Sequence, residues 1–269
     1  MKVFNSLLKI AFLVVFILAF FCNCGVKKSI LDQAATQTTA LNTLSEDFLK
    51  AIREDKPTTQ FTERLAQMEL KEIELGLQTD AERYAFWINI YNAYIQVVLK
   101  AKPELYEDRR SFFSEEMLEI AGRKVSFETI EHGILRKSQW NLGLGYVRKW
   151  FPGEFERKLR VEKRDFRIHF ALNCGAKDCP PVAVYTPGRL EQQLEMGTRK
   201  YLERTTRFDE SSNTVTVSSL FSWFRGDFGG KSGTRKILSD KGLIPDTKGV
   251  SIEYSNYDWT LELDNFIDL

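Results

Sequence analysis

A long apolar helix near the middle of the chain constrains the fold most strongly. Thr79-Asp-Ala-Glu82 has the pattern of a capping box, and the apolar run behind it continues to about Ala101, where Pro103 stops it. Apolar side chains cover most of the helical wheel between Tyr84 and Lys100. Such a helix must be buried on nearly all sides, so the sequence predicts a globular domain built around it.

The polar residues of this helix gather on one strip. Within about 80° of arc lie Asn89, Asn92, Gln96 and Lys100. Buried amides need hydrogen-bond partners. Asn89 and Asn92 therefore either orient a catalytic group or a ligand, or bridge neighbouring backbone at the rim of the core.

Hydrophobic periodicity predicts the remaining elements. Further helices are expected over 44–52, 61–77, 126–137 (with Ser126 as its cap), 189–204 and 231–243. A short hairpin is expected around Gly122, and strands over 166–172, 214–217 and 250–254. The sequence thus predicts an α+β fold, with a helix-rich N-terminal half and a small, mostly antiparallel sheet from the C-terminal half.

The N-terminal 25 residues have the pattern of an export leader. Lys9 precedes thirteen apolar residues, Ile10 to Cys22, which suit a signal peptide better than a membrane span. Cys22 or Cys24 is a candidate for acylation, although a cleaved secreted form and an uncleaved anchor stay open. We expect a leader over 1–25, a polar tether over 26–43 and a single domain over 44–269. This domain would lie outside the cytoplasm, membrane-attached as a lipoprotein of the cell envelope.

The composition limits the kinds of partner that the protein is expected to bind. Hydrophobic residues make up 43% of the chain, enough for a sizeable core. The 38 basic and 37 acidic residues leave a net charge of +1, and no basic block stands out. We therefore expect no nucleic-acid partner. No cofactor and no metal are expected either, and the substrate would be a small molecule or a peptide.

Reactive side chains concentrate in the segment from Arg167 to Pro181. It holds one of the two histidines, His169, and both cysteines outside the leader, Cys174 and Cys179. On a strand, His169 and Asn173 would point away from the main apolar layer. The cysteines have four interpretations: a disulfide, worth about 2 kcal/mol; a zinc site with His132 and His169; a catalytic Cys174 with a histidine base; or inert buried thiols.

The helix predicted over 126–137 places Glu131 in the middle of its apolar face, with His132 about 100° away. A buried carboxylate is costly unless it is paired or protonated. Glu131 is therefore either locked in a pair, with Arg136, Arg167 or an Asn of the long helix, or tuned for proton transfer.

An aromatic run, Phe221-Ser-Trp-Phe224, precedes Arg225-Gly-Asp227. The run predicts core packing followed by a turn. Asp227 in that turn is still within reach of a site loop.

Several phrases of the chain resemble the domain-of-unknown-function family 547. They are Phe86-Trp-Ile-Asn-Ile-Tyr-Asn-Ala93, Ile130-Glu-His-Gly-Ile-Leu-Arg136, His169-Phe-Ala-Leu-Asn-Cys-Gly-Ala176, Cys179-Pro-Pro181, Gly226-Asp-Phe228 and Tyr257-Asp-Trp259. The resemblance spans roughly residues 80 to 260. It implies a domain of bacterial exported proteins and plant relatives without an established activity.

In the plant relatives the second cysteine is not kept and the first is shifted, which counts against an obligatory disulfide or zinc site. The resemblance therefore favours these site residues: Glu131, His132, Arg136, His169, Asn89 and Asn92.

Two functions remain open. The first is a cysteine-dependent hydrolase or transferase of the papain-like or transglutaminase-like kind, which acts on an amide or ester through Cys174, His169 and Glu131, with His132 as an alternative base. The second is a non-catalytic binding or scaffold domain held by a buried Asn, Glu, His and Arg network. Convergence of Glu131, His169 and Cys174 in an open pocket would favour the enzyme.

Overall fold

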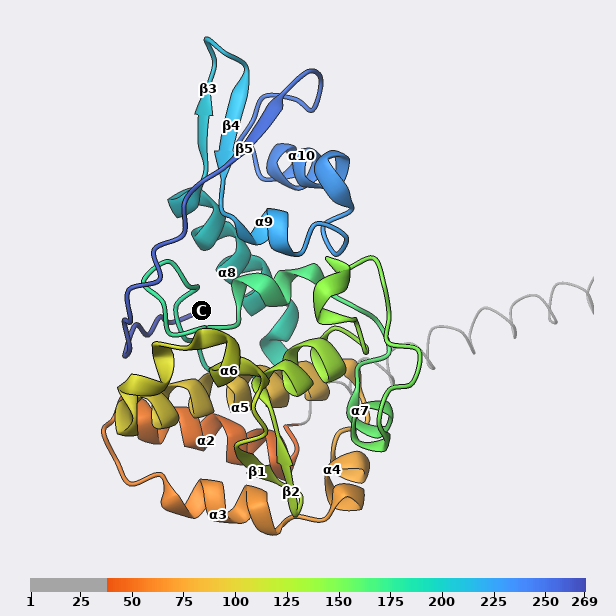
Figure 1. Cartoon of the computed structure of the whole chain (residues 1–269), viewed down its shortest axis with the longest axis vertical. Coiled ribbons are helices and arrows are strands. Elements are labelled where there is room, and N and C mark those ends of the chain that lie inside the picture. The colour runs from red at the N-terminus through yellow and green to blue at the C-terminus, as the bar shows by residue number, and fades with distance from the viewer. Residues whose placement is uncertain (1–37) are drawn as a thin grey trace, which may run out of the picture. The chain divides into compact units, whose positions relative to one another are not determined.

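A computed structural model describes residues 38–269 (Figure 1). The predicted leader over 1–25 and the tether up to residue 37 lie outside these described residues. The predicted long helix is confirmed as α5, Asp80–Ala101. Thr79 Oγ1 accepts a hydrogen bond from Glu82 N at 3.3 Å, and Glu82 Oε2 accepts one from Thr79 N at 2.8 Å, which completes the capping box. Among residues 38–269, no helix is long and apolar enough to cross a membrane.

The N-terminal half packs helices around α5. These are α2 (Ala40–Arg53), α3 (Thr59–Gln67), α4 (Leu70–Gly76), η1 (Pro103–Tyr106) and α6 (Arg109–Ser114). The predicted hairpin forms as β1 (Leu118–Ile120) and β2 (Arg123–Val125).

Two helix boundaries in this half differ from the prediction. The helix expected from residue 44 begins at Ala40, because Thr39 Oγ1 accepts a hydrogen bond from Asn42 N and caps it. The single helix expected over 61–77 was wrong. It is divided into α3 and α4, because Met68 between them has an extended backbone.

The C-terminal half holds the main sheet and its covering helices. The short helices come first: η2 (Thr129–Leu135), η3 (Asn141–Gly143), α7 (Glu154–Leu159), η4 (Phe166–Phe170) and η5 (Pro187–Arg189). They are followed by α8 (Leu190–Thr205), β3 (Arg207–Asp209), β4 (Thr214–Val217), α9 (Leu220–Trp223), α10 (Gly230–Asp240) and β5 (Ser251–Tyr254). Strand β4 pairs antiparallel with β3 and parallel with β5. The α+β class is confirmed, while the main sheet combines one antiparallel and one parallel pair.

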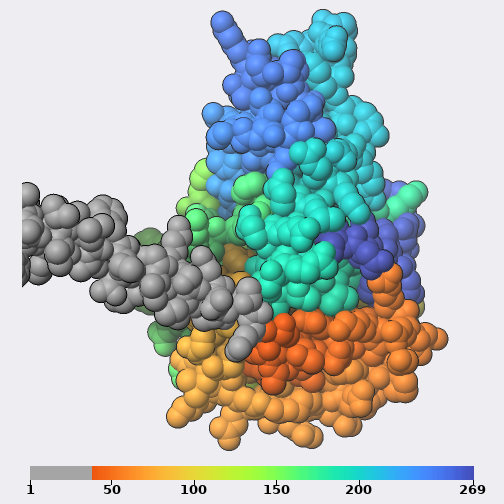
Figure 2. Space-filling view, turned by 180° about the vertical axis from the view of Figure 1, so that it is seen from behind, coloured from red at the N-terminus to blue at the C-terminus, as the bar shows by residue number. Residues whose placement is uncertain are grey.

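The buried apolar residues of the described chain form two hydrophobic cores. One surrounds α5, and the other lies between the sheet, α8, α9 and α10. The last residues of the chain return from the sheet to the N-terminal helices, as Figures 1 and 2 show. Arg53 Nη1 lies 2.6 Å from Asp268 Oδ1, and Val182 pairs with Phe266 in a parallel bridge. The C-terminal segment thus ties both halves of the domain together.

The strand predicted over 166–172 was wrong, because η4 is a 3₁₀-helix. Asp165 Oδ1 accepts a hydrogen bond from Arg167 N at 2.9 Å, and this cap starts a helical turn in place of an extended strand. The turn buries Ile168 in the first core and Phe170 in the second. His169 between them is buried as well, so it does not face solvent.

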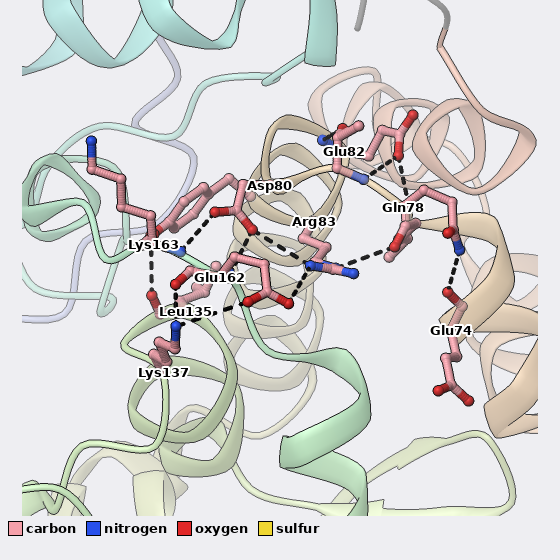
Figure 3. A network of polar contacts seen from close by, with 12 residues as sticks. Glu74, Gln78, Asp80, Glu82, Arg83, Leu135, Lys137, Glu162 and Lys163 are labelled. Carbon is pink, nitrogen blue, oxygen red and sulfur yellow. Dashed lines mark hydrogen bonds and ion pairs between the residues drawn. The ribbon is translucent and has the colours of Figure 1, made fainter. Parts of the chain in front are cut away.

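A polar network at the start of α5 holds the chain that leads into η4 (Figure 3). Asp80 accepts hydrogen bonds from Glu162 N at 2.7 Å and Lys163 N at 2.8 Å. Tyr84 Oη donates to Lys163 O at 2.7 Å. Because these contacts fix residues 162–163 on α5, they also fix where the following turn places His169.

Candidate active site

The helix that carries Glu131 and His132 is wound as a π-helix. Ser126 caps it as predicted, since its Oγ accepts a hydrogen bond from Thr129 N at 3.1 Å. Beyond that, residues 129–135 widen to i→i+5 bonding, for example Arg136 N to Glu131 O at 2.8 Å. A wheel of 100° per residue therefore fails here. In the structure, the two neighbouring side chains line one cavity instead of diverging.

This cavity, of about 200 Å³, lies between α5, η2, η4, α9 and the segment after β5. Its titratable and sulfur-bearing lining consists of Glu128, Glu131, His132, His169, Cys174, Tyr91 and Tyr257. Its apolar lining consists of Phe113, Leu172, Pro180, Leu220, Trp223, Phe224 and Trp259. The cavity is partly open to solvent. It combines an apolar wall with a few convergent polar groups, as ligand sites do.

Glu131 is a carboxyl of this cavity with a raised pKa. Burial raises its pKa to about 7, and Asp227 adds to the rise, while Arg136 and the Tyr91 hydroxyl act in the opposite direction. The Glu131 side chain keeps 16% of its surface exposed, and it lines the cavity. A carboxyl with this pKa exchanges protons readily at physiological pH. Of the two roles open for Glu131, its environment favours proton transfer.

His132 is a neutral hydrogen-bond donor. Its Nδ1 lies 2.5 Å from Arg136 Nη1, and because a guanidinium only donates, Nδ1 must accept. The ring proton is therefore on Nε2, which has no hydrogen-bond partner within residues 38–269. Burial lowers the pKa of His132 well below its ordinary value, and the charge of Arg136 lowers it further.

His169 is fixed by Asp227. Its Nε2 lies 2.8 Å from Asp227 Oδ2, and its ring stacks on Phe224 with centroids 3.9 Å apart. Burial lowers the pKa of His169 to about 4, and the hydrogen bond to Asp227 only partly offsets this. The imidazole is thus neutral near pH 7, with its proton on Nε2 and the Nδ1 lone pair left for a ligand.

Asp227 anchors the cluster electrostatically. Besides His169, it accepts hydrogen bonds from Arg136 Nε at 2.7 Å and Arg164 Nη1 at 2.9 Å. Burial raises the pKa of Asp227, but the hydrogen bond from His169 and the charge and hydrogen bond of Arg136 outweigh it and bring the value to about 2. Asp227 is therefore ionised and orients both His169 and Arg136.

The two cysteines form a disulfide, Cys174–Cys179. Of the four interpretations, this corrects the one that makes Cys174 the nucleophile, because a sulfur bonded to another sulfur has no thiolate to attack with. It also removes both sulfur ligands from the zinc alternative, and within residues 38–269 no group of His, Cys, Asp and Glu is arranged to hold a metal. Cys174 still lines the cavity beside His169.

The buried amides bind backbone and do not line the cavity. Asn89 exchanges two hydrogen bonds with Tyr185, at 2.9 and 2.8 Å. Asn92 donates to Ala171 O at 3.0 Å and accepts from Asn173 N at 2.8 Å. Asn173 in turn spans the disulfide loop, where its Nδ2 donates to Pro180 O at 2.8 Å.

The candidate residues thus separate into two groups. The structure brings Glu131, His132, His169 and Cys174 together around the cavity, with Arg136 bonded to His132 at its edge. The three amides do not line the cavity: Asn92 and Asn173 hold the segment that carries Cys174, and Asn89 holds the backbone of Tyr185. Arg167, one of the possible partners of Glu131, instead binds Asp165 and Glu191.

The sequence predicted no definite role for Asp227 and none for the aromatic wall of the cavity, which consists of Trp223, Tyr257 and Trp259. Asp227 follows the aromatic run in a turn, and only that proximity pointed to it. The run itself is divided: Phe221 packs in the core as predicted, but Trp223 and Phe224 line the cavity. Tyr257 and Trp259 lie in one of the family-like phrases, which was the only signal for them.

Comparison with known proteins confirms the family resemblance for part of the chain. Residues 75–202 match the family described as "Protein of unknown function, DUF547". The DUF547 match contains Glu131, His132, His169 and the disulfide, and it ends within α8, before Asp227 and the aromatic residues that complete the cavity. No curated protein and no solved structure gives a significant match.

Proposed function

We propose that this protein is a hydrolase that cleaves an ester or amide in the cavity by acid–base catalysis. What carries the proposal is the convergence of Glu131 and His132 on a partly open cavity, where burial raises the pKa of Glu131 to about 7 and lowers the pKa of His132. Environments that push two pKa values apart define acid and base roles in known enzymes.

In the proposed reaction water is the nucleophile. The Glu131 carboxylate takes a proton from water as the water oxygen bonds to the carbonyl carbon. The His132 Nε2–H group donates to the oxyanion that develops. When the C–O or C–N bond breaks, protonated Glu131 returns the proton to the leaving alcohol or amine. The products are a carboxylic acid and that alcohol or amine.

Asp227 acts through the imidazoles. It holds His169 with Nδ1 free to accept a hydrogen bond from the substrate, and it holds the guanidinium of Arg136 that fixes the tautomer of His132. The aromatic wall of Trp223, Tyr257 and Trp259 favours a substrate with a flat or apolar group next to the scissile bond. Since the cavity is small, a small molecule or the end of a peptide fits better than a folded protein.

The test is the pH dependence of hydrolysis of a panel of nitrophenyl esters and nitroanilide amides. We expect kcat/KM to rise with pH and to reach half its plateau near pH 7, because the base must be ionised. Glu131→Gln should lower kcat by about 10²–10⁴-fold and remove the pH dependence. Glu128→Gln, a carboxylate of the same cavity, is the matched control and should change kcat by less than about tenfold.

Two other results would contradict the proposal. Activity that appears only after reduction and is abolished by iodoacetamide would make Cys174 the nucleophile. Tight binding of a ligand without turnover, unchanged in Glu131→Gln, would make the domain a binding module.

We also propose that the domain is exported and attached to the membrane through a lipidated leader. The apolar run over 10–22 with its cysteines supports this. The Cys174–Cys179 disulfide adds support, because such bonds persist outside the cytoplasm. Labelling cells with a fatty-acid analogue should mark the protein in the envelope fraction, whereas an unlabelled cytoplasmic protein would contradict this proposal.

A further inference from the structure

One segment of the domain presents nearly all of its apolar side chains to the outside. Seven of the nine large hydrophobic side chains that are exposed within residues 38–269 lie between Trp140 and Phe151. Trp150 is 85% exposed and Phe151 is 93% exposed. Single exposed apolar residues need no explanation, but a contiguous patch marks an interaction surface. We call residues 140–151 the aromatic loop.

The backbone of the aromatic loop is hydrogen-bonded within the loop itself. Trp140 N donates to Val147 O at 2.9 Å, Gly143 N to Trp140 O at 2.9 Å, and Tyr146 N to Gly143 O at 2.8 Å. A segment that enters a bilayer must satisfy its backbone polar groups internally, because lipid offers no partners. Between Trp140 and Val147, the aromatic loop meets part of this requirement.

The aromatic loop is also held rigidly on the domain. Gly226 N donates to Leu144 O at 2.8 Å, and Arg164 Nη1 donates to Gly145 O at 3.1 Å. The two chains approach so closely that a Cβ on Gly226 would lie 2.5 Å from the carbonyl carbon of Gly145. The backbone of the loop is thus held in place on the domain, and it forms a platform that carries the exposed side chains.

Charge distinguishes the possible partners of this platform. Residues 139–153 contain no Asp or Glu. Arg148 is exposed and has no carboxylate partner within residues 38–269, whereas Lys149 pairs with Glu156. Lys163, next to Arg164, is exposed and also lacks such a partner in this part of the chain. Tryptophan and tyrosine prefer the bilayer interface, and unpaired cations prefer anionic headgroups.

We propose that the aromatic loop inserts its side chains into the interfacial layer of an anionic bilayer. Trp150 and Phe151 enter to the depth of the upper acyl chains, while Arg148 stays among the headgroups. This contact is additional to any lipid anchor, and it does not depend on the proposed hydrolase activity. It fixes one face of the domain against the membrane.

The test uses tryptophan fluorescence of the full chain on vesicles of phosphatidylcholine and phosphatidylglycerol with brominated acyl chains, which quench tryptophans that enter the lipid. The chain has five tryptophans and none of them lies in residues 1–25, so the signal does not report on the leader. We expect strong quenching of the wild type. Trp150→Phe should remove most of it, while Trp223→Phe, which changes a tryptophan of the cavity, should leave the quenched component in place.

Arg148→Glu should weaken quenching on these vesicles more than on vesicles of phosphatidylcholine alone. Absence of quenching in the wild type, or quenching that Trp150→Phe does not reduce, would overturn the proposal. So would a blue shift of Trp150 that grows with protein concentration in the absence of vesicles, because the loop would then be an interface between copies of this chain.

Discussion

Glu131 imposes a cost on the stability of the folded domain. Its pKa is about 7 when folded and close to the ordinary 4.5 when unfolded. The unfolded chain therefore releases this proton at lower pH, and folding loses stability as pH rises from 4.5 to about 7. The full loss is about 3 kcal/mol.

Glu131→Gln should remove this loss while it lowers activity. Its advantage over the wild type in the free energy of unfolding should grow by about 3 kcal/mol between about pH 4 and about pH 8. Urea denaturation at both pH values measures it. A difference that does not change with pH would contradict the role given to burial.

Asp227 has the opposite effect on stability, because it neutralises buried cations. Asp227→Asn leaves Arg136 without its charged partner and should cost about 3–5 kcal/mol. The matched control is Asp240→Asn, which only removes a surface pair with Lys236 at 2.9 Å and should cost about 0.3–0.5 kcal/mol. Equal costs in urea denaturation would show that the Asp227 cluster does not depend on charge.

The site residues differ in how far sequence could reveal them. Glu131 stands out because a carboxylate among apolar residues demands an explanation, although the 100° wheel that placed it on an apolar face fails in this π-helix. Asp227 could not be assigned in the same way. Its importance arises from contacts with His169 and Arg136, which lie 58 and 91 residues away in the chain.

At the scale of elements, α5 acts as the scaffold of the site through its amides. Asn92→Leu keeps the volume roughly but leaves Ala171 O and Asn173 N without partners, at an expected cost of about 2–6 kcal/mol. Asn256→Leu is the control, because Asn256 is exposed and makes no side-chain hydrogen bond within residues 38–269. Denaturation midpoints that shift equally would contradict the structural role of Asn92.

The sequence predicted correctly those helices and strands whose limits are set by neighbouring residues in the chain. The capping box, Pro103 and the apolar run together define α5, and the β-branched run defines β4. The elements at the site were predicted less well, because a helical turn over 166–170 and a π-helix over 129–135 violate the periods that sequence patterns assume. Both distortions place titratable groups in the cavity, which is where departures from regular structure are expected.

At the scale of the molecule, the disulfide closes a short loop next to the cavity. The pair should contribute about 2 kcal/mol, because a ring of this size restricts the unfolded chain modestly. Urea denaturation of the Cys174→Ser/Cys179→Ser double variant measures this contribution against the oxidised wild type. An unchanged midpoint, or free thiols in the protein isolated without reductant, would contradict the pairing.

The two-core arrangement was only partly visible in the sequence. Composition and periodicity predicted an α+β fold with helices first and the sheet later, and the structure agrees. They could not show that η4 joins the two cores, nor that residues 255–269 return to the N-terminal helices, because both depend on contacts between distant segments. The cavity forms where these segments meet.

A measurement of the pKa of Glu131 tests the proposed acid–base chemistry most directly. Its carboxyl carbon can be followed by NMR titration of the full chain labelled with ¹³C-glutamate, with Glu131→Gln to assign the resonance. We expect a midpoint of about 7, because burial, with Asp227 nearby, disfavours the carboxylate. A midpoint near the ordinary 4.5 would show an ionised, merely structural carboxylate and would contradict the proposed acid–base chemistry.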